Sequence, residues 1–343
     1  MDNPSKSDWR KLYQAAIKFQ QISPWTWMGN EDLFAVENPD SGELGYCSIL
    51  GSGKEEFGLG IFLGARGFKR YLEVMSTEAG PEGFDEGIMT PMLSLLFANR
   101  QELQKEDIEV IRSLGLQFRG RNAWPLFRSQ RPGYAPWFLE KEEGVFLTAA
   151  IEQALVVSNK VHNNKLDLFD NVDEDLVFTR YYRGGEWREE WRSPELSPRD
   201  LSNGIEAKEV INEAELLLLR NSADKLSGSW EVDIFVLPIP IGPPSSRPYF
   251  PICFLVVEGK QGLIIDSQMT EPWITLSQKR DTVIQILKRA RQLPRNIRVK
   301  SEKVREILEP VIGSLGISLR MGPLPLLEEA KIGLRSYLSG RGA

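Results

Sequence analysis

Histidine is almost absent from this sequence, since His162 is the only one in 343 residues. Zinc sites rich in histidine and the usual Ser-His-Asp or Cys-His catalytic arrangements need imidazole side chains, so any such site would have to use this residue. His162 stands beside Asn163 and Asn164, near the end of a predicted helix. We therefore interpret it as a surface histidine at a helix end rather than as a ligand or a base.

Cysteine is nearly as scarce, and the two residues, Cys47 and Cys253, lie in apolar runs far apart in the sequence. This pattern predicts two buried, reduced thiols. No apolar run approaches the roughly 20 residues that cross a bilayer. The first residues, MDNPSKSDWRKLY, lack the apolar segment of a signal peptide. We expect a cytoplasmic protein with no membrane partner.

Positive charge is not in excess either: 42 Lys and Arg stand against 48 Asp and Glu, which gives a net charge of −6. An acidic balance argues against non-specific binding to nucleic acid, so we do not expect nucleic acid as a partner. The composition, 41% hydrophobic and 26% charged, is that of a soluble globular protein. A chain of 343 residues is too long for one ordinary core and predicts two domains.

The segment Arg247–Asp266 is the most strongly patterned part of the chain. It contains two apolar runs, Ile252–Val257 and Leu263–Ile265, on either side of the polar turn Glu258–Gly262. Apolar runs separated by glycine turn residues predict a β-hairpin. Because the runs are nearly continuous rather than alternating, we expect both faces of this hairpin to be covered.

Hydrophobic periodicity predicts the remaining elements. Helices are expected at 7–22, 65–75, 91–100, 105–114, 148–161, 205–220, 282–291, 303–312 and 324–338. Strands are expected at 33–37, 45–50, 57–63, 116–119, 176–183, 186–192, 230–237, 296–299 and 317–319, with a further short hairpin at 137–139 and 145–147. The predicted fold class is α+β, with two lobes, each a mostly antiparallel sheet with helices packed on one face. The predicted domains are 1–222 and 229–343, joined near Asn221–Gly228.

Two pairs of segments resemble each other within the chain. Ser113–Arg119 shares its SLG start, its alternation and its final arginine with Ser314–Arg320, and Arg131–Pro136 is similar to Arg247–Pro251. Internal duplication of an α+β lobe would explain both pairs. Convergence would explain them too, because a helix, a glycine and a strand in succession favour the same residues for capping reasons.

The chain also resembles an uncharacterised bacterial domain family. Pro24–Val74, Trp124–Arg128 and Pro132–Trp137 carry this resemblance, and Pro248–Leu338 is similar to a second family that often follows the first. Both are classed as domains of unknown function. The resemblance implies a bacterial cytosolic protein of two domains, and it supplies no active-site residues.

One pattern points to an enzyme. Asp233 on one predicted strand and Glu258 with Lys260 at the end of another resemble the Asp…Glu-x-Lys arrangement of metal-dependent nucleases, in which carboxylates hold Mg²⁺ and a lysine helps to activate water. Gly259 and Gly262 instead favour a plain turn at this place, and the acidic chain is unsuited to nucleic acid. The acidic run 167–175 lacks the EF-hand spacing, so we interpret it as a solvated loop without a metal.

The predicted hairpin 176–192 is rich in aromatic residues and arginine, including Arg183, Trp187 and Trp191. Such residues stack on single-stranded nucleic acid, anchor protein partners, or form cross-strand pairs with the glutamates of the same hairpin. Our leading hypothesis is a non-enzymatic cytosolic binding or regulatory protein without a cofactor. It would act through contact with another protein, and Arg183, Trp187 and Trp191 are the candidate binding residues. The alternative is a metal-dependent hydrolase or nuclease that uses Asp233, Glu258 and Lys260.

Overall fold

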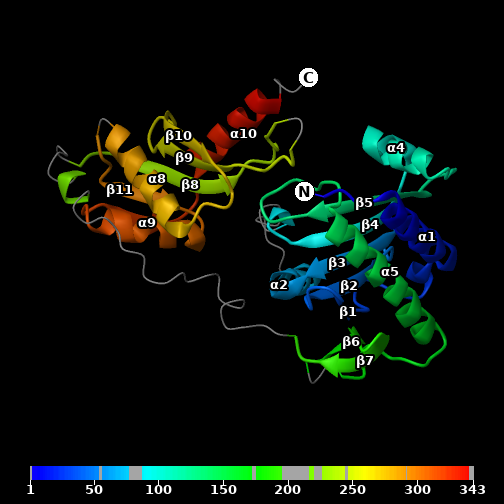
Figure 1. Ribbon diagram of the computed structural model, residues 1–343. Helices are drawn as coiled ribbons and strands as arrows, with labels where there is room; N and C mark the ends of the chain where they lie inside the picture. The colour runs from blue at the N-terminus through cyan, green and yellow to red at the C-terminus, as the bar shows by residue number, and fades with distance from the viewer. Residues whose placement is uncertain are drawn as a thin grey trace. The chain divides into compact units, whose positions relative to one another are not determined.

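The computed structural model describes residues 2–53, 56–76, 87–171, 175–194, 216–219, 226–243, 246–290 and 292–339 (Figure 1). The chain divides into two compact units. The first comprises Met1–Pro132 and Pro136–Gly204, and the second comprises Gly133–Ala135 and Ile205–Ala343. Each unit holds one sheet with helices. Five of the six neighbour pairs in the first sheet are antiparallel, as are two of the four in the second, so the α+β class with two lobes is confirmed.

The first unit contains a seven-stranded sheet in the order β5-β4-β3-β2-β1-β6-β7. All neighbours in it are antiparallel except β1 and β6, which run parallel. Its strands are β1 (Phe34–Glu37), β2 (Leu44–Leu50), β3 (Gly58–Leu63), β4 (Met92–Ala98), β5 (Trp124–Gln130), β6 (Val177–Arg183) and β7 (Glu186–Arg192). Its helices are α1 (Lys6–Ile22), α2 (Gly64–Met75), α4 (Lys105–Ser113) and α5 (Lys141–His162), with short 3-10 turns at Pro24–Thr26 and Arg100–Glu102.

Helices cover both faces of this sheet, with a different core on each, so the prediction of helices on one face was wrong for this unit. Phe34 and Val36 of β1 point into the main core, which α1 and α5 share, and these helices lie side by side in Figure 1. Ala35, between them in the strand, points to the other face and packs with Tyr46 and with Phe68 of α2. The alternation of side chains along a strand thus divides the apolar residues between two layers.

The start of α5 corrects the short hairpin predicted at 137–139 and 145–147. The helix begins at Lys141, because Glu140 and Glu143 form a capping box in which the Glu140 N–H donates to Glu143 Oε2 at 2.8 Å. Gly144, which lies between the two predicted strands, is a residue of the helix. A Cβ atom there would be 3.3 Å from Pro4 Cγ, so close packing accounts for this glycine.

Two further predictions in the first unit were wrong. The segment 91–100 forms strand β4 and not a helix, because β4 is an interior strand whose residues are buried on both faces. A continuous apolar run of this length is typical of either element. The segment 116–119 forms no strand. Its Phe118 ring instead packs against the main core, with its centroid 6.1 Å from that of Tyr13.

The second unit contains a five-stranded sheet in the order β10-β9-β8-β11-β12. Strands β8, β9 and β10 are antiparallel neighbours, whereas β11 runs parallel to both β8 and β12. Its strands are β8 (Ser229–Val236), β9 (Ile252–Glu258), β10 (Ile264–Thr270), β11 (Asn296–Val299) and β12 (Ser318–Met321). Its helices are α8 (Leu276–Arg289), α9 (Glu302–Gly313) and α10 (Pro325–Ser339), and residues 216–219 are also helical.

Helix α10 packs on one face of β8 and β9. A buried cluster joins the sheet to the first turn of the helix. Its sheet residues are Phe235, Leu237, Cys253, Leu255 and Val257. These residues alternate in sequence, so the intervening positions face the opposite side of the sheet. The predicted hairpin is confirmed as β9 and β10, but only β9 has both faces covered, since six of its seven residues are buried and none of the seven in β10 is.

The two units differ in connectivity. In the first, the strand after α2 is β4, which joins the sheet antiparallel to β3. In the second, the strand after α8 is β11, which crosses back and joins parallel to β8. One pair of similar segments does come together, because Tyr134 and Tyr249 form an isolated antiparallel bridge within the second unit. The predicted helix 205–220 and the linker Asn221–Gly228 lie largely outside the described residues.

Candidate functional site

Asp233, the first residue of the predicted nuclease set, is engaged in a buried ion pair. It lies on β8, and its Oδ2 accepts a hydrogen bond from Lys331 Nζ of α10 at 2.5 Å. The two side chains are 11% and 10% exposed. The ammonium group also lies 4.4 Å from the centre of the Phe235 ring and 3.4 Å from Glu328 Oε1. Asp233 therefore fixes the position of α10 on the sheet.

Glu231 makes a second contact of the same kind. It is two residues before Asp233 on β8 and therefore on the same face, and it is 2% exposed. Its Oε2 accepts a hydrogen bond from the Leu327 N–H at 2.9 Å, and Arg298 Nη1 lies 3.4 Å from Oε1. The first N–H groups of a helix have no partner inside the helix, and a negative charge there is favourable. Glu231 thus caps α10 from a distant strand.

Glu258 and Lys260 lie elsewhere, so the predicted Asp233, Glu258 and Lys260 site is not assembled. Asp233 is paired with Leu255, whereas Glu258 is paired with Trp230, three residues away along β8 and therefore on the opposite face. Glu258 Oε2 accepts the backbone N–H of Lys260 at 2.9 Å, which closes the turn. Within the described ranges, no three His, Cys, Asp or Glu side chains are placed to hold one metal ion.

The aromatic residues of the predicted hairpin 176–192 form cross-strand pairs in β6 and β7. Gly184 and Gly185 have φ values of 63° and 87°, as a tight two-residue turn requires. Trp191 lies 5.5 Å from Phe178 between ring centres, and Trp187 lies 5.5 Å from Tyr182. Both tryptophans also pack against the main core. Trp187 and Trp191 therefore attach the hairpin to its own unit.

Arg183, the third candidate binding residue, is paired with Glu37 of β1. Glu37 is 3% exposed and sits between two guanidinium groups. Its Oε1 accepts from Arg183 Nη1 at 2.6 Å, and its Oε2 accepts from Arg192 Nη1 at 2.7 Å. Arg192 also covers the Tyr181 ring, at 4.5 Å from its centre. We call Glu37, Arg183 and Arg192 the hairpin clamp.

Glu189 connects the other face of the hairpin to α5. Lys160 Nζ lies 2.5 and 2.6 Å from its two carboxylate oxygens, and Arg180 Nη1 donates to Oε2 at 2.6 Å. Arg180 also donates to Gln153 of α5. The hydrogen bond from Lys160, with a smaller contribution from Arg180, lowers the pKa of Glu189 below its ordinary value of 4.5, and partial burial opposes this change.

We expect attachment of the hairpin to weaken in acid. A carboxyl group whose pKa is lower in the folded state stabilises that state fully above its unfolded pKa, and this contribution is lost as the pH falls through the folded pKa. Because the Glu189 side chain is 37% exposed, the effect should be below about 1 kcal/mol. Hydrogen exchange of residues 177–192, corrected for intrinsic rates, should show lost protection below pH 4.5. The Glu189→Gln variant should be less protected at pH 7 and should change less with pH; an equal pH response in the two proteins would contradict the assignment.

The single histidine and the two cysteines lie in places that suit a role in the fold rather than in chemistry. His162 is the last residue of α5, and its ring centre lies 4.5 Å from that of Trp27. Cys47 and Cys253 are buried free thiols, as predicted. Burial raises the pKa of Cys253 to about 11. Burial also raises the pKa of Cys47, so neither sulfur is set up as a thiolate nucleophile.

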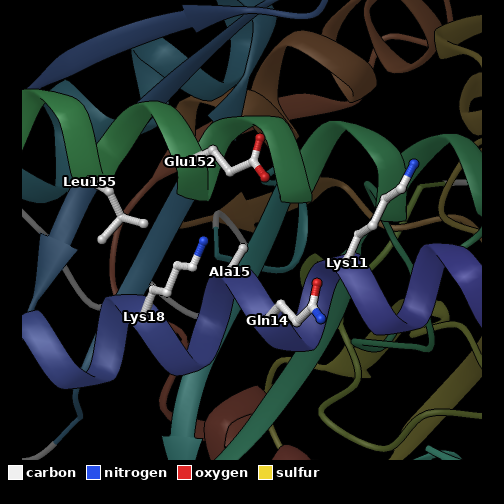
Figure 2. A pocket seen from close by; sticks show the side chains of 6 residues that line it. All are labelled: Lys11, Gln14, Ala15, Lys18, Glu152 and Leu155. Atoms are coloured by element: carbon white, nitrogen blue, oxygen red, sulfur yellow. The ribbon is translucent and has the colours of Figure 1, made fainter.

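A shallow groove of about 280 Å³ runs between α1 and α5 (Figure 2). Lys11, Gln14 and Lys18 project from α1 along it, and Glu152 projects from α5. These four side chains belong to exposed residues, whereas Ala15 beneath them is buried. The groove is the seam between two packed amphipathic helices, with an ordinary charged rim.

The free edge of the second sheet is the surface that the sequence did not reveal. Among the strands that the structure describes, β9 is the one neighbour of β10. Leu263 just before it is 62% exposed, Ile264 is 52% exposed and Met269 is 44% exposed. We call the surface formed by residues 263–270 the β10 edge. Two polar side chains of this strand are held by α8: Arg289 donates hydrogen bonds to Asp266 and to Gln268, both at 2.8 Å.

The edge strands β5, β7 and β12 are protected against pairing with a further strand, and β10 has less protection. Strand β5 contains Pro125 and is bridged at Ser129 by Trp137. Strand β7 has five charged residues out of seven, and β12 is four residues long. Proline, charge and short length are the usual means of blocking an edge. Strand β10 is seven residues long, and Asp266 is its one charged residue. A bulge between Ile264 and Asp266 is its one protective feature.

Comparison with known proteins places this α+β chain among domains of unknown function. The chain belongs to the family described as Domain of unknown function (DUF7309), whose model matches residues 9–180. A second model, Domain of unknown function (DUF6930), matches residues 216–335. No curated protein matches the chain.

One solved structure, the catalytic core domain of BIV integrase, is 18% identical over 33% of this chain and 70% of that chain, with a TM-score of 0.24. A score this low supports no conclusion about function. Among the described helices, none combines the length and the apolar character that a membrane crossing needs.

Proposed function

We propose that this protein is a non-enzymatic binding protein that acts through contact with another protein, and that the β10 edge is its contact surface. The observation that carries the proposal is the exposure of apolar side chains, Leu263, Ile264 and Met269, along an edge strand with a single charge. An edge with unpaired backbone groups accepts a further strand through main-chain hydrogen bonds. Exposed apolar side chains beside it add buried area on contact.

The roles of the charged side chains support this proposal over a hydrolase. Asp233, Glu231 and Glu37 are the most deeply buried carboxylates described above, and each is held by partners that fix its own unit. A catalytic carboxylate needs a reacting group within reach. Asp233 and Glu258 lie on opposite faces of the sheet, which supports the binding proposal over the nuclease hypothesis.

We also propose that the protein works in the bacterial cytoplasm, without a cofactor. Its two reduced, buried thiols are consistent with a reducing compartment. The net charge of −6 favours a protein partner over nucleic acid. Arg289, the cation at the β10 edge, already binds Asp266, so it offers little to a phosphate backbone.

Site-specific photo-crosslinking tests the proposal. A benzophenone amino acid is placed at Ser267 in β10 or, as the matched control, at Ser318 in β12; both are exposed residues of edge strands in the same sheet. After irradiation of bacterial cells that make the protein, position 267 should give a discrete protein adduct, and position 318 should not. Adding Met269→Lys should remove the adduct, because a lysine on the edge opposes strand pairing. Equal adducts at the two positions, or none at 267, would rule out the β10 edge as the contact surface.

A further inference from the structure

We infer that the partner of the β10 edge is the β10 edge of a second copy of this chain, paired antiparallel about Ser267. This inference rests on the proposed function and specifies its partner. The two five-stranded sheets would then continue across a two-fold axis. A two-fold contact uses the same surface on both copies, so the surface must be complementary to itself.

The order of residues in β10 meets this requirement. An antiparallel pair centred on Ser267 places Asp266 opposite Gln268 of the second copy, and brings the bulge residue Ile265 beside Met269. The carboxylate of Asp266 then faces the amide of Gln268, and the apolar side chain of Ile265 lies beside that of Met269. No two like charges stand opposite each other. A pair centred on Asp266 would place two carboxylates opposite each other, which is unfavourable. With the centre at Ser267, residues Asp266–Gln268 of the two copies pair within the unbroken part of each strand, and the bulge of each copy lies at the end of the ladder.

Local electrostatics at the β10 edge permits this occupant. The chain carries a net charge of −6, so two copies repel each other over most orientations. At the β10 edge the one carboxylate, Asp266, is already bound by Arg289 at 2.8 Å. Two such edges can therefore approach without facing negative charges.

The backbone geometry is also suitable over the central part of the strand. From Asp266 to Thr270, β10 pairs with β9 in unbroken register, opposite Val256 to Ile252. The bulge is confined to the start of the strand, between Ile264 and Asp266. Residues 266–270 thus form a regular template whose outward N–H and C=O groups alternate along the strand as a new antiparallel neighbour requires.

Sedimentation of the purified full-length protein over a concentration series tests the association. The wild type should pass from monomer to dimer mass as concentration rises. Met269→Lys should raise the dimer dissociation constant by about tenfold or more, because the pair buries an ammonium group against Ile265 of the second copy. Met321→Lys is the matched control: Met321 is 46% exposed on the β12 edge, against 44% for Met269. Its dissociation constant should equal that of the wild type.

A disulfide tests the register. Residues directly opposite in an antiparallel pair have Cα atoms about 4.5–5.5 Å apart, within the roughly 4.4–6.8 Å span of a disulfide. Ser267→Cys should therefore form a covalent dimer with oxidised glutathione, whereas Ser318→Cys should not. The native cysteines do not interfere, because both are buried.

The outcomes separate this inference from the proposed function. A wild type that stays monomeric at every concentration, with no covalent dimer of Ser267→Cys, overturns self-pairing. The proposed function survives that result if the photo-crosslinker at position 267 captures a different protein in cells, and it fails if no adduct forms there. A concentration-dependent dimer that Met269→Lys does not weaken also overturns the inference, because it places the dimer contact elsewhere.

Discussion

Replacing Lys331 by methionine should destabilise the docking of α10 by about 3–5 kcal/mol. The substitution keeps most of the apolar length of the side chain and removes the ammonium group 2.5 Å from Asp233 Oδ2. Asp233 would then be a nearly buried carboxylate without its charged partner, and desolvation of an unpaired charge is costly. A loss of about 3–5 kcal/mol in the free energy of local opening should make the amide hydrogens of Leu324–Leu334 exchange a hundredfold faster or more in the full-length protein.

Two further variants make this test specific. Glu328, the weaker partner of the same lysine, is 46% exposed, so Glu328→Gln should change the free energy by less than about 1 kcal/mol. The double variant Asp233→Ala with Lys331→Met should recover much of the loss, because an apolar pair carries no desolvation cost. If Lys331→Met leaves exchange unchanged, the ion pair is not structural, and Asp233 is again a candidate for chemistry.

Local patterns in the sequence predicted many of the elements and two hairpins. The run Ile252–Val257 followed by a glycine turn predicted the β9–β10 hairpin, and Gly184 with Gly185 predicted the β6–β7 hairpin. These predictions succeeded because turn residues and apolar alternation act over a few positions. The segment 91–100 shows the limit, since an interior strand and a buried helix can both be uniformly apolar.

The roles of the charged residues could not be predicted, because their partners are distant in sequence. Glu37 and Arg183 are 146 positions apart, and Asp233 and Lys331 are 98 apart. No local pattern distinguishes such residues from ordinary surface charges. Without their partners, Asp233 was assigned to a nuclease-like pattern and Arg183 to a binding surface. The β10 edge was missed for a related reason. Its second half, Ser267–Thr270, is mostly polar, so the predicted strand ended at Ile265, whereas pairing with β9 extends it to Thr270.

Replacing Glu37 by glutamine should selectively loosen the β6–β7 hairpin. The parallel pairing of β1 with β6 covers two register pairs, Ala35 with Thr179 and Val36 with Arg180. Side chains must therefore supply much of the attachment. Each charge-assisted hydrogen bond of the hairpin clamp contributes about 1.5–3 kcal/mol. Both arginines can regain water when the charge is removed, so we expect a net loss of about 2 kcal/mol.

That loss corresponds to roughly thirtyfold faster hydrogen exchange across 177–192, with little change in α1 and in the second unit. Glu186→Gln provides the control, because Glu186 is an exposed glutamate of the same hairpin at its turn end. It should leave exchange within twofold of the wild type. Equal effects of the two substitutions would mean that the clamp does not hold the hairpin. Arg183 would then be available to a partner, and the hairpin would return as a second contact surface beside the β10 edge. If only Glu37→Gln acts, Arg183 serves the fold and the β10 edge stands as the contact surface.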